Sequence, residues 1–541
     1  MGSPSKAVTS GLKPYQGPWD HDTVQHLLKR TMFGATQEDI HYFMAKGMHD
    51  SLQELIYTNE ALPGPPLNAY SYGGKNNDPD VPFGRTWIDA PTYTGDQNNP
   101  NGLRRNSFQS WWFELMFFQR RTIREKMVLF WHNHFATETR IIQKAIFCYQ
   151  YNQLLRTHAL ANFRVFLKVI TCNPAMLYYL NGDSNTNVSP NENYGRELQE
   201  LFAIGKGPGS HYTESDIKEA ARVLTGWIID YRTNAATTQF VSYKHDNGDK
   251  HFSSFYGNKV IKGQKGPDGE KETDELLDMI CAQHEVALFI CRKLYRFFIY
   301  HEIDSVTEKN IIAPLAAIFR KNNYNIQPVL LALFSSEHFF DKANRGGIIK
   351  SPADFTIGLL RECRVPIPTD LAGRYNVLYN LQSACALQQQ QLGQPPNVAG
   401  WPAYYQAPEY DKLWINSVTL PARNQFVEKI VSTGIKENNF VTKIDVLKLT
   451  QTLSDPGDPN SLIAELAQYF FINGLPAEQQ DYVKSKILLG NLQSGTADHY
   501  WTQAWERLQQ QPSDTANTKD VQSKLEELYK YLLRMPNYHL I

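Results

Sequence analysis

The sequence predicts a mainly α-helical protein: a large multi-helix body with a small β-hairpin insertion and a C-terminal helical subdomain. Apolar residues recur at helical spacing over most of the 541 residues, and 42% of the residues are hydrophobic. A chain of this size and composition can bury a large core. Turn-forming residues gather in a few stretches between the periodic segments.

The first elements follow from caps and periodicity. Residues 1–18 are rich in Pro, Gly and Ser and predict a flexible arm. Asp20 is a candidate N-cap for a helix over residues 21–33, where apolar side chains recur at helical spacing. A second helix follows Gly34 and runs to about residue 57.

Residues 62–102 are too rich in turn formers for regular structure and predict a long loop insertion, which suits a functional flap. Residues 103–204 are helical almost throughout, with broad apolar faces that predict helices packed on several sides. Residues 236–262 differ, because the stretches QFVSY and NKVIK flank a polar loop, which predicts a β-hairpin.

Helices resume after the hairpin. Ser351, Pro352 and Asp354 together match the start of a helix with a capping box. QLGQPPNVAG at 391–400 is predicted to form a rigid loop. Composition turns more polar after about residue 440, so the main domain is placed at 19–440 and the C-terminal subdomain at 441–541.

Bulk composition excludes some functions. The formal net charge of −1 gives no argument for nucleic acid as a partner. No apolar stretch approaches the ~20 residues of a membrane helix. The first residues lack the apolar core of a signal peptide, which favours a cytoplasmic protein, although removal of a signal would leave the same appearance in a periplasmic or extracellular one. None of the six cysteines forms a CxxC pair, so buried free thiols are expected.

The stretch REKMVLFWHNHF at 124–135 carries the first candidate site residues, Glu125, His132 and His134. On a helix Glu125 and His132 share a face, while His134 lies on another. The histidines are candidate metal ligands or acid–base groups, and core histidines with satisfied hydrogen bonds are the alternative. Both imidazoles could face one side only if the helix ended near Trp131.

A second candidate set lies in PNENYGRELQELF at 190–202. Ser189 to Glu192 match a capping box, so Glu192 is expected to be structural. Asn193, Glu197 and Glu200 form one polar stripe that could bind a metal or transfer protons. The alternative is a solvated face on which Arg196 pairs with Glu200.

The third stretch is YTESDIKEAARVLTGW at 212–227. Thr213 and Asp216 again form a capping box, and Glu219 with Arg222 has the spacing of an ordinary helix pair. The sequence contains no P-loop, dinucleotide-binding, G-x-S-x-G or H-E-x-x-H motif, which argues against the enzyme classes that use them.

Several motifs in the order found here closely resemble the bacterial Domain-of-Unknown-Function 1800 family, in particular its Bacteroidetes-type members. The motifs are HLLKRTMFGAT (26–36), EKMVLFWHNHFAT (125–137), LLRTHALANFR (154–164), NPAMLYYLNG (173–182), PNENYGRELQELFAIGKG (190–207), YTESDIKEAARVLTGW (212–227), KLYRFF (293–298), IKSP (349–352), PPNVAGWP (395–402) and WINS (414–417). Gly195 and Gln199 stand where Ala and Met are usual. The resemblance implies a helical bacterial protein. It also implies a possible sulfatase- or alkaline-phosphatase-like partner and, in some members, an extracytoplasmic location.

Two function hypotheses follow. The first is an enzyme, metal-assisted or acid–base, that acts hydrolytically on a polar, glycan-like substrate. Its candidate catalytic residues are Glu125, His132, His134, Glu197, Glu200 and Glu219, of which His132, His134, Glu197 and Glu200 could bind a divalent metal ion. Its candidate substrate-binding residues are Asn133, Asn191, Asn193, Arg196, Arg222, Trp227, Asn397 and Trp401. The second is a binding or assembly protein in which these residues form a closed structural network.

Overall fold

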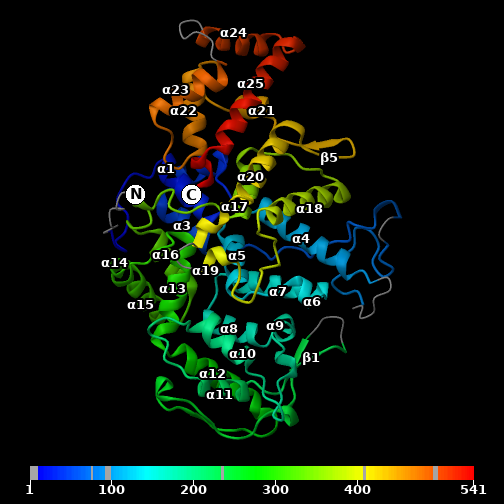
Figure 1. The fold of residues 1–541 in the computed structure, drawn as a ribbon, viewed down its shortest axis with the longest axis vertical. Helices are drawn as coiled ribbons and strands as arrows, with labels where there is room; N and C mark the ends of the chain where they lie inside the picture. The colour runs from blue at the N-terminus through cyan, green and yellow to red at the C-terminus, as the bar shows by residue number, and fades with distance from the viewer. Residues whose placement is uncertain (1–9, 75–76, 92–98, 233–236, 406–409, 491–496) are drawn as a thin grey trace.

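A computed structural model describes residues 10–74, 77–91, 99–232, 237–405, 410–490 and 497–541 (Figure 1). Within these ranges the chain is mainly helical, as the sequence predicts, with three small two-stranded antiparallel sheets. No helix of the described ranges is long and apolar enough to cross a bilayer.

The helices of the first half build the body around α5. They are α1 (His21–Thr31), α2 (Gln37–Lys46), α3 (Met48–Ile56), α4 (Asn101–Phe117), α5 (Arg124–His134), α6 (Thr139–Ile142), α7 (Ala145–His158), α8 (Phe163–Thr171), α9 (Pro174–Tyr179), α10 (Glu192–Glu197) and α11 (Glu214–Val223). Every residue of α5 from Glu125 to His134 is buried, which fits its place at the centre of the molecule in Figure 1.

The second half surrounds this centre and extends from it. Its helices are α12 (Glu270–Cys281), α13 (His284–Phe298), α14 (Ser305–Thr307), α15 (Ala313–Lys321), α16 (Ile326–Phe334), α17 (Pro352–Glu362), α18 (Leu371–Leu387), α19 (Pro402–Tyr405), α20 (Thr419–Glu428), α21 (Val446–Thr450), α22 (Pro459–Phe470), α23 (Ala477–Tyr482), α24 (Ala497–Gln510) and α25 (Thr515–Arg534). Helices α22 to α25 gather at one end of the long axis (Figure 1). Whether residue 440 is a domain boundary stays a prediction.

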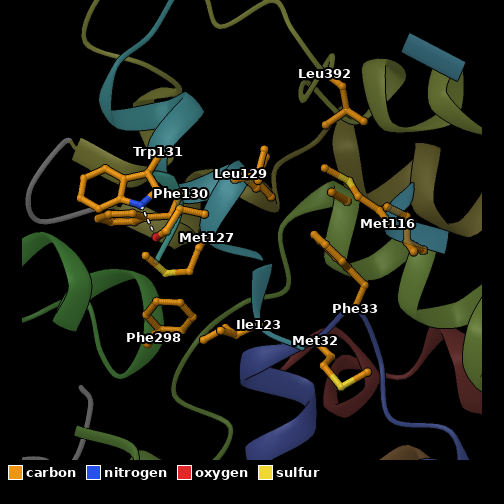
Figure 2. Close-up of a cluster of buried hydrophobic side chains, with 14 of the residues drawn as sticks. Met32, Phe33, Met116, Ile123, Met127, Leu129, Phe130, Trp131, Phe298 and Leu392 are labelled. Atoms are coloured by element: carbon orange, nitrogen blue, oxygen red, sulfur yellow. Dashed lines mark hydrogen bonds between the residues drawn. The ribbon is translucent and has the colours of Figure 1, made fainter. Parts of the chain in front are cut away.

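The core contacts of α5 explain its position. Figure 2 shows Met127, Leu129 and Trp131 of this helix among Met32, Met116 and Phe298, side chains supplied by α4, α13 and the end of α1. The Trp131 indole N–H donates to the carbonyl oxygen of Ala159 at 2.8 Å, so the one polar atom of this large ring is satisfied.

The caps predicted from the sequence account for several helix starts. The Asp20 side chain accepts a hydrogen bond from Thr23 N–H, and Ser351 accepts one from Asp354 N–H. Thr213 and Asp216 form a complete capping box. The prediction that Ser189 caps the next helix is wrong: α10 begins at Glu192, and Asn191 is its N-cap. The Asn191 backbone N–H donates to Asn185 Oδ1 at 2.8 Å, which fixes the chain just before the helix.

A small antiparallel hairpin is present inside residues 236–262, as predicted, but the strand that begins this range pairs outside it, and residue 236 lies outside the described ranges. Strand β2 (Thr237–Phe240) pairs with β1 (Trp227–Asp230), which precedes the predicted hairpin. Strands β3 (Lys250–His251) and β4 (Val260–Ile261) pair with each other inside it. Trp227 takes part in the first pairing: its ring packs on that of Phe240 at 5.7 Å, and its indole N–H donates to the Thr273 hydroxyl. A third sheet joins β5 (Ile435–Glu437) to β6 (Phe440–Thr442).

The predicted arm at 1–18 is docked where it is described. Residues 1–9 lie outside the described ranges, but Tyr15 N–H donates to the Ser335 carbonyl at 2.8 Å and Glu337 N–H donates to that of Lys13 at 2.8 Å. The Tyr15 ring also packs on Phe340 at 4.6 Å. These contacts outweigh the composition that predicted flexibility.

The loop insertion folds back on α4, except for residues 75–76 and 92–98, which are not described. Asp78 accepts two hydrogen bonds from the buried Arg104 guanidinium, at 2.8 and 2.9 Å. The buried Trp87 indole N–H donates to Ser107 at 3.2 Å. All six cysteines are free thiols, five of them buried, as expected.

Candidate ligand-binding site

Glu125 forms a buried ion pair. Its two carboxylate oxygens accept hydrogen bonds from Arg156 at 2.6 and 2.9 Å, and this guanidinium lies 5.0 Å from the centre of the Trp111 ring. A bidentate pair of this kind uses both oxygens of the carboxylate. Glu125 therefore faces α7 and Arg156 rather than His132.

Helix α5 continues through His134, so the two histidines point into different surroundings. His132 lies between two tryptophan rings, 5.1 Å from that of Trp112 and 5.7 Å from that of Trp401. Burial lowers the pKa of His132 to about 3, which leaves the imidazole neutral near pH 7. The His132 ring thus packs against the Trp401 ring and helps to hold it in place.

His134 bonds to a carbonyl and to a lysine. Its Nε2 donates to the Phe202 carbonyl oxygen at 2.9 Å, and its Nδ1 accepts from Lys293 Nζ at 3.0 Å. Burial, reinforced by the charge of Lys293, holds the pKa of His134 well below its usual range. Burial also lowers the pKa of Lys293 to about 7. Both imidazole nitrogens of His134 are therefore occupied by protein groups.

Asn133 clamps the loop that leads to Trp401. Its Oδ1 accepts a hydrogen bond from Trp401 N–H at 2.8 Å. Gly400 has a φ of +93°, and a Cβ placed there would meet Asn133 Oδ1 at 2.4 Å and the Asn133 carbonyl oxygen at 2.5 Å. Only glycine fits this position, because both the backbone conformation and the space exclude a side chain.

Replacing Gly400 with alanine is expected to lower the free energy of unfolding by about 3 kcal/mol, since it adds backbone strain to a close contact. Urea denaturation of the purified variant measures this. Gly257→Ala is the matched control: its φ is +65°, but nothing lies within 4 Å of an added Cβ. The control should lose only about 1 kcal/mol, and equal losses in the two variants would contradict the clamp.

The other predicted asparagines cap helices and turns. Asn191 is the N-cap of α10, and Asn193 Nδ2 donates to the Leu180 carbonyl oxygen at 3.1 Å. Asn397 Oδ1 accepts from Ala399 N–H at 2.8 Å and so shapes the turn before Gly400. These contacts are structural, and only Asn397 lies on the loop of Trp401.

The predicted polar stripe on α10 does not continue as a regular helix. A π-helical segment, η3 (Leu198–Ala203), follows directly, and Glu200 pairs with Lys206. Arg196 pairs with Glu214 at 2.7 Å rather than with Glu200. Burial and the neighbouring Glu200 raise the pKa of Glu197. Glu200 and Arg196 therefore contact Lys206 and Glu214 rather than the histidines of α5.

The third predicted set forms its own network. Arg222 donates to Glu219 at 2.7 Å and to both oxygens of Asp246, and Trp227 lies on β1. Among the residues that the structure describes, no three His, Cys, Asp or Glu side chains are grouped so that they could hold a metal ion. The structure thus places the predicted residues in several separate networks, and of these His132, Asn133, Asn397 and Trp401 converge on one loop.

That loop forms a wall of an open pocket of about 400 Å³. Two buried tryptophans, Trp401 and Trp414, are among its lining residues. Four carboxamides also line it, those of Gln389, Gln391, Gln394 and Asn416. The remaining lining residues are alanines, prolines and a leucine, so no charged side chain of the described ranges lines the pocket. We call it the amide pocket.

Local structure fixes the walls of the amide pocket. Helix α18 ends at Leu387, and Gln389 then takes a φ of +72°, which turns the chain into the loop. Asn416 donates to Gln389 Oε1 at 3.2 Å and accepts from the backbone N–H groups of Val418 and Thr419. The segments before Trp401 and after Trp414 are thereby joined across the pocket.

A second, smaller cavity of about 20 Å³ adjoins the amide pocket, with Ala403 and Trp414 common to both linings. Five charged side chains line this cavity: Arg30, Lys126, Arg296, Asp354 and Asp411. We call it the charged cavity. No local sequence pattern points to this cavity, because its charged residues come from segments far apart in the chain. One signal in the sequence was available: Lys29 and Arg30 stand within the apolar stretch HLLKRTMF, and both are buried in the structure.

Most of the motifs that carry the family resemblance meet at these two spaces. PPNVAGWP and WINS supply both tryptophans of the amide pocket, and FWHNHF holds Trp401 in place. HLLKRTMFGAT, EKMVLFWHNHFAT, KLYRFF and IKSP supply lining residues of the charged cavity, namely Arg30, Lys126, Arg296, Phe297, Ile349 and Ser351.

Comparison with known families agrees with that resemblance. The family model described as "Protein of unknown function (DUF1800)" matches residues 26–540, so the chain belongs to this family. No curated protein and no solved structure matches the chain.

Proposed function

For this member of the DUF1800 family, we propose that the amide pocket binds a neutral, glycan-like ligand. The observation that carries the proposal is the lining itself, which among the described residues consists of two tryptophans, four carboxamides and small apolar side chains without a charged one. In this proposal His132 supports the pocket wall by packing on Trp401, and His134 is structural, bonded to the Phe202 carbonyl and to Lys293.

The chemistry of the lining favours a saccharide. A carboxamide both donates and accepts hydrogen bonds, which matches the hydroxyl groups of a sugar. The alanines, prolines and leucine of the lining, with the small exposed parts of the two tryptophans, offer apolar surface for the C–H groups of a sugar. An anionic ligand would find no opposite charge here, and a purely apolar one would leave the carboxamides unpaired.

Titration with neutral oligosaccharides tests this proposal. Cellohexaose, hexa-N-acetylchitohexaose and maltohexaose are titrated, and a sugar that binds is expected to change the intrinsic tryptophan fluorescence, because Trp401 and Trp414 line the pocket. Ala386→Phe adds a ring to the pocket wall and should weaken binding about tenfold or more by steric exclusion.

Leu387→Phe is the matched control, because Leu387 is the next residue of the same helix, is 71% exposed and does not line the pocket. It should bind as the parent does. If no neutral oligosaccharide changes the fluorescence, or if Ala386→Phe binds as tightly as the parent, the amide pocket is not a glycan site.

A further inference from the structure

Two carboxamides of the amide pocket are oriented by their hydrogen bonds to each other and to the backbone. Asn416 Oδ1 accepts from the backbone N–H groups of Val418 and Thr419, both at 2.9 Å. Asn416 Nδ2 is therefore the donor of this side chain, and it donates to Gln389 Oε1 at 3.2 Å. Because the Gln389 oxygen is turned to Asn416, the Nε2 amino group of Gln389 is left for a ligand.

Gln391 is oriented in the same way by a residue that does not line the pocket. Arg140, whose guanidinium has donors only, donates to Gln391 Oε1 at 3.4 Å. The Gln391 oxygen therefore faces Arg140, which leaves Gln391 Nε2 unpaired. Among the residues that the structure describes, neither the oxygen nor the nitrogen of the Gln394 carboxamide has a partner in the protein.

The free hydrogen-bonding groups of these four carboxamides are thus mostly donors. Within the described part of the chain, Gln389, Gln391 and Gln394 each keep a free amino group, whereas only Gln394 keeps an oxygen without a partner. All three side chains are exposed or partly exposed, so a ligand can reach them. The small apolar residues of the lining are Ala386, Pro396, Pro402, Ala403 and Leu413. The pocket therefore matches a neutral ligand that offers strong acceptors and a small apolar group.

We propose that the ligand of the amide pocket is an N-acetylated glycan whose acetamido groups accept hydrogen bonds from Gln389, Gln391 and Gln394. This inference rests on the proposed function and specifies its substrate class. An acetamido oxygen accepts two hydrogen bonds and brings no hydrogen that needs a partner. The acetamido N–H finds an acceptor in Gln394 Oε1, and the methyl group finds apolar surface in the lining.

A sugar hydroxyl fits the same groups less well. It can accept a hydrogen bond from a carboxamide, but it must then donate its own hydrogen to water or to an oxygen that already accepts from Asn416 or Arg140. The direction of the free hydrogen bonds therefore favours the acetamido group over the hydroxyl group.

Isothermal titration calorimetry with two hexasaccharides tests the inference. Hexa-N-acetylchitohexaose and cellohexaose have the same β-1,4-linked chain and differ in the group at C2, which is acetamido in the first and hydroxyl in the second. The protein is expected to bind the N-acetylated sugar at least about tenfold more tightly.

Gln391→Glu and Gln389→Glu each reverse one hydrogen bond of the pocket. The exchange replaces the free amino group with an oxygen and keeps the oxygen that accepts from Arg140 or Asn416. A hydroxyl can turn and donate to the new carboxylate, whereas an acetamido oxygen cannot. Each variant should therefore lower the preference for the N-acetylated sugar, measured as the ratio of the two affinities, about tenfold.

Gln143→Glu is the control, because Gln143 is exposed, does not line the pocket and introduces the same charge close to Arg140 in the chain. It should keep the parent's ratio. Equal affinities of the parent for the two sugars, or a ratio that neither pocket variant changes, would overturn the acetamido inference and leave the glycan site standing. If these two sugars and maltohexaose all fail to bind, the glycan site itself is overturned, and the acetamido inference with it.

Discussion

Replacing Glu362 with alanine is expected to lower the free energy of unfolding by about 4 kcal/mol, because the change leaves a buried cation without its partner. The Glu362 side chain is fully buried at the end of α17. One oxygen lies 3.3 Å from Lys29 Nζ of α1, and the other accepts a hydrogen bond from the Tyr538 hydroxyl at 3.0 Å. Urea denaturation monitored by circular dichroism measures the loss.

Glu428→Ala provides the comparison, because Glu428 also pairs with basic residues, Arg534 and Lys530, but is about half exposed. An exposed pair of this kind contributes at most about 1 kcal/mol. A Glu362 variant that loses no more than the Glu428 variant would show that the buried contact does not stabilise the fold.

Acidification is expected to destabilise the protein through its buried histidines. Burial lowers the pKa of His132 to about 3, and burial with the nearby Arg423 and Lys350 lowers that of His539 to about 3. Between pH 6.5 and pH 3 the unfolded chain binds a proton at each of these positions and the folded chain does not. Stability therefore falls as the pH falls, by about 2 kcal/mol for each histidine between pH 6.5 and 4.5.

The free energy of unfolding of His132→Phe, measured from pH 4.5 to 7.5, should depend less steeply on pH than that of the parent. The aromatic ring can still pack between Trp112 and Trp401. His499→Phe serves as the control, because His499 is exposed on α24 and should keep the parent's slope. Identical slopes in the parent and the His132 variant would contradict the link between burial and acid sensitivity.

Much of the helical fold could be predicted from the sequence, since helices depend on local caps and periodicity. Asp20, Ser351 and Thr213 cap the helices that their motifs predict. Strand pairing was harder to predict. Strand β2 pairs with β1, which lies before residues 233–236, and β1 begins at Trp227, the last residue of a motif that otherwise predicts a helix.

The candidate site was predicted only in part. Trp401 and Asn397 lie on the loop that the sequence singled out, and Trp401 lines the amide pocket. The charged cavity was missed because its residues come from α1, α5, α13 and α17 and from the segment after α19, and nothing local to any of these segments shows that they meet. Long-range packing decides which charged side chains are buried, and periodicity alone does not report it.

The contacts of α1 also set an order of events during protein synthesis. Gln25 donates to the carbonyl oxygens of Gln468 and Tyr469, and Lys29 donates to those of Tyr469 and Phe470. At a synthesis rate of about 5–20 residues per second, α1 leaves the ribosome many seconds before the residues at 468–470 are synthesised. The side chains of Gln25 and Lys29 therefore stay without these partners until the segment at 468–470 has been made.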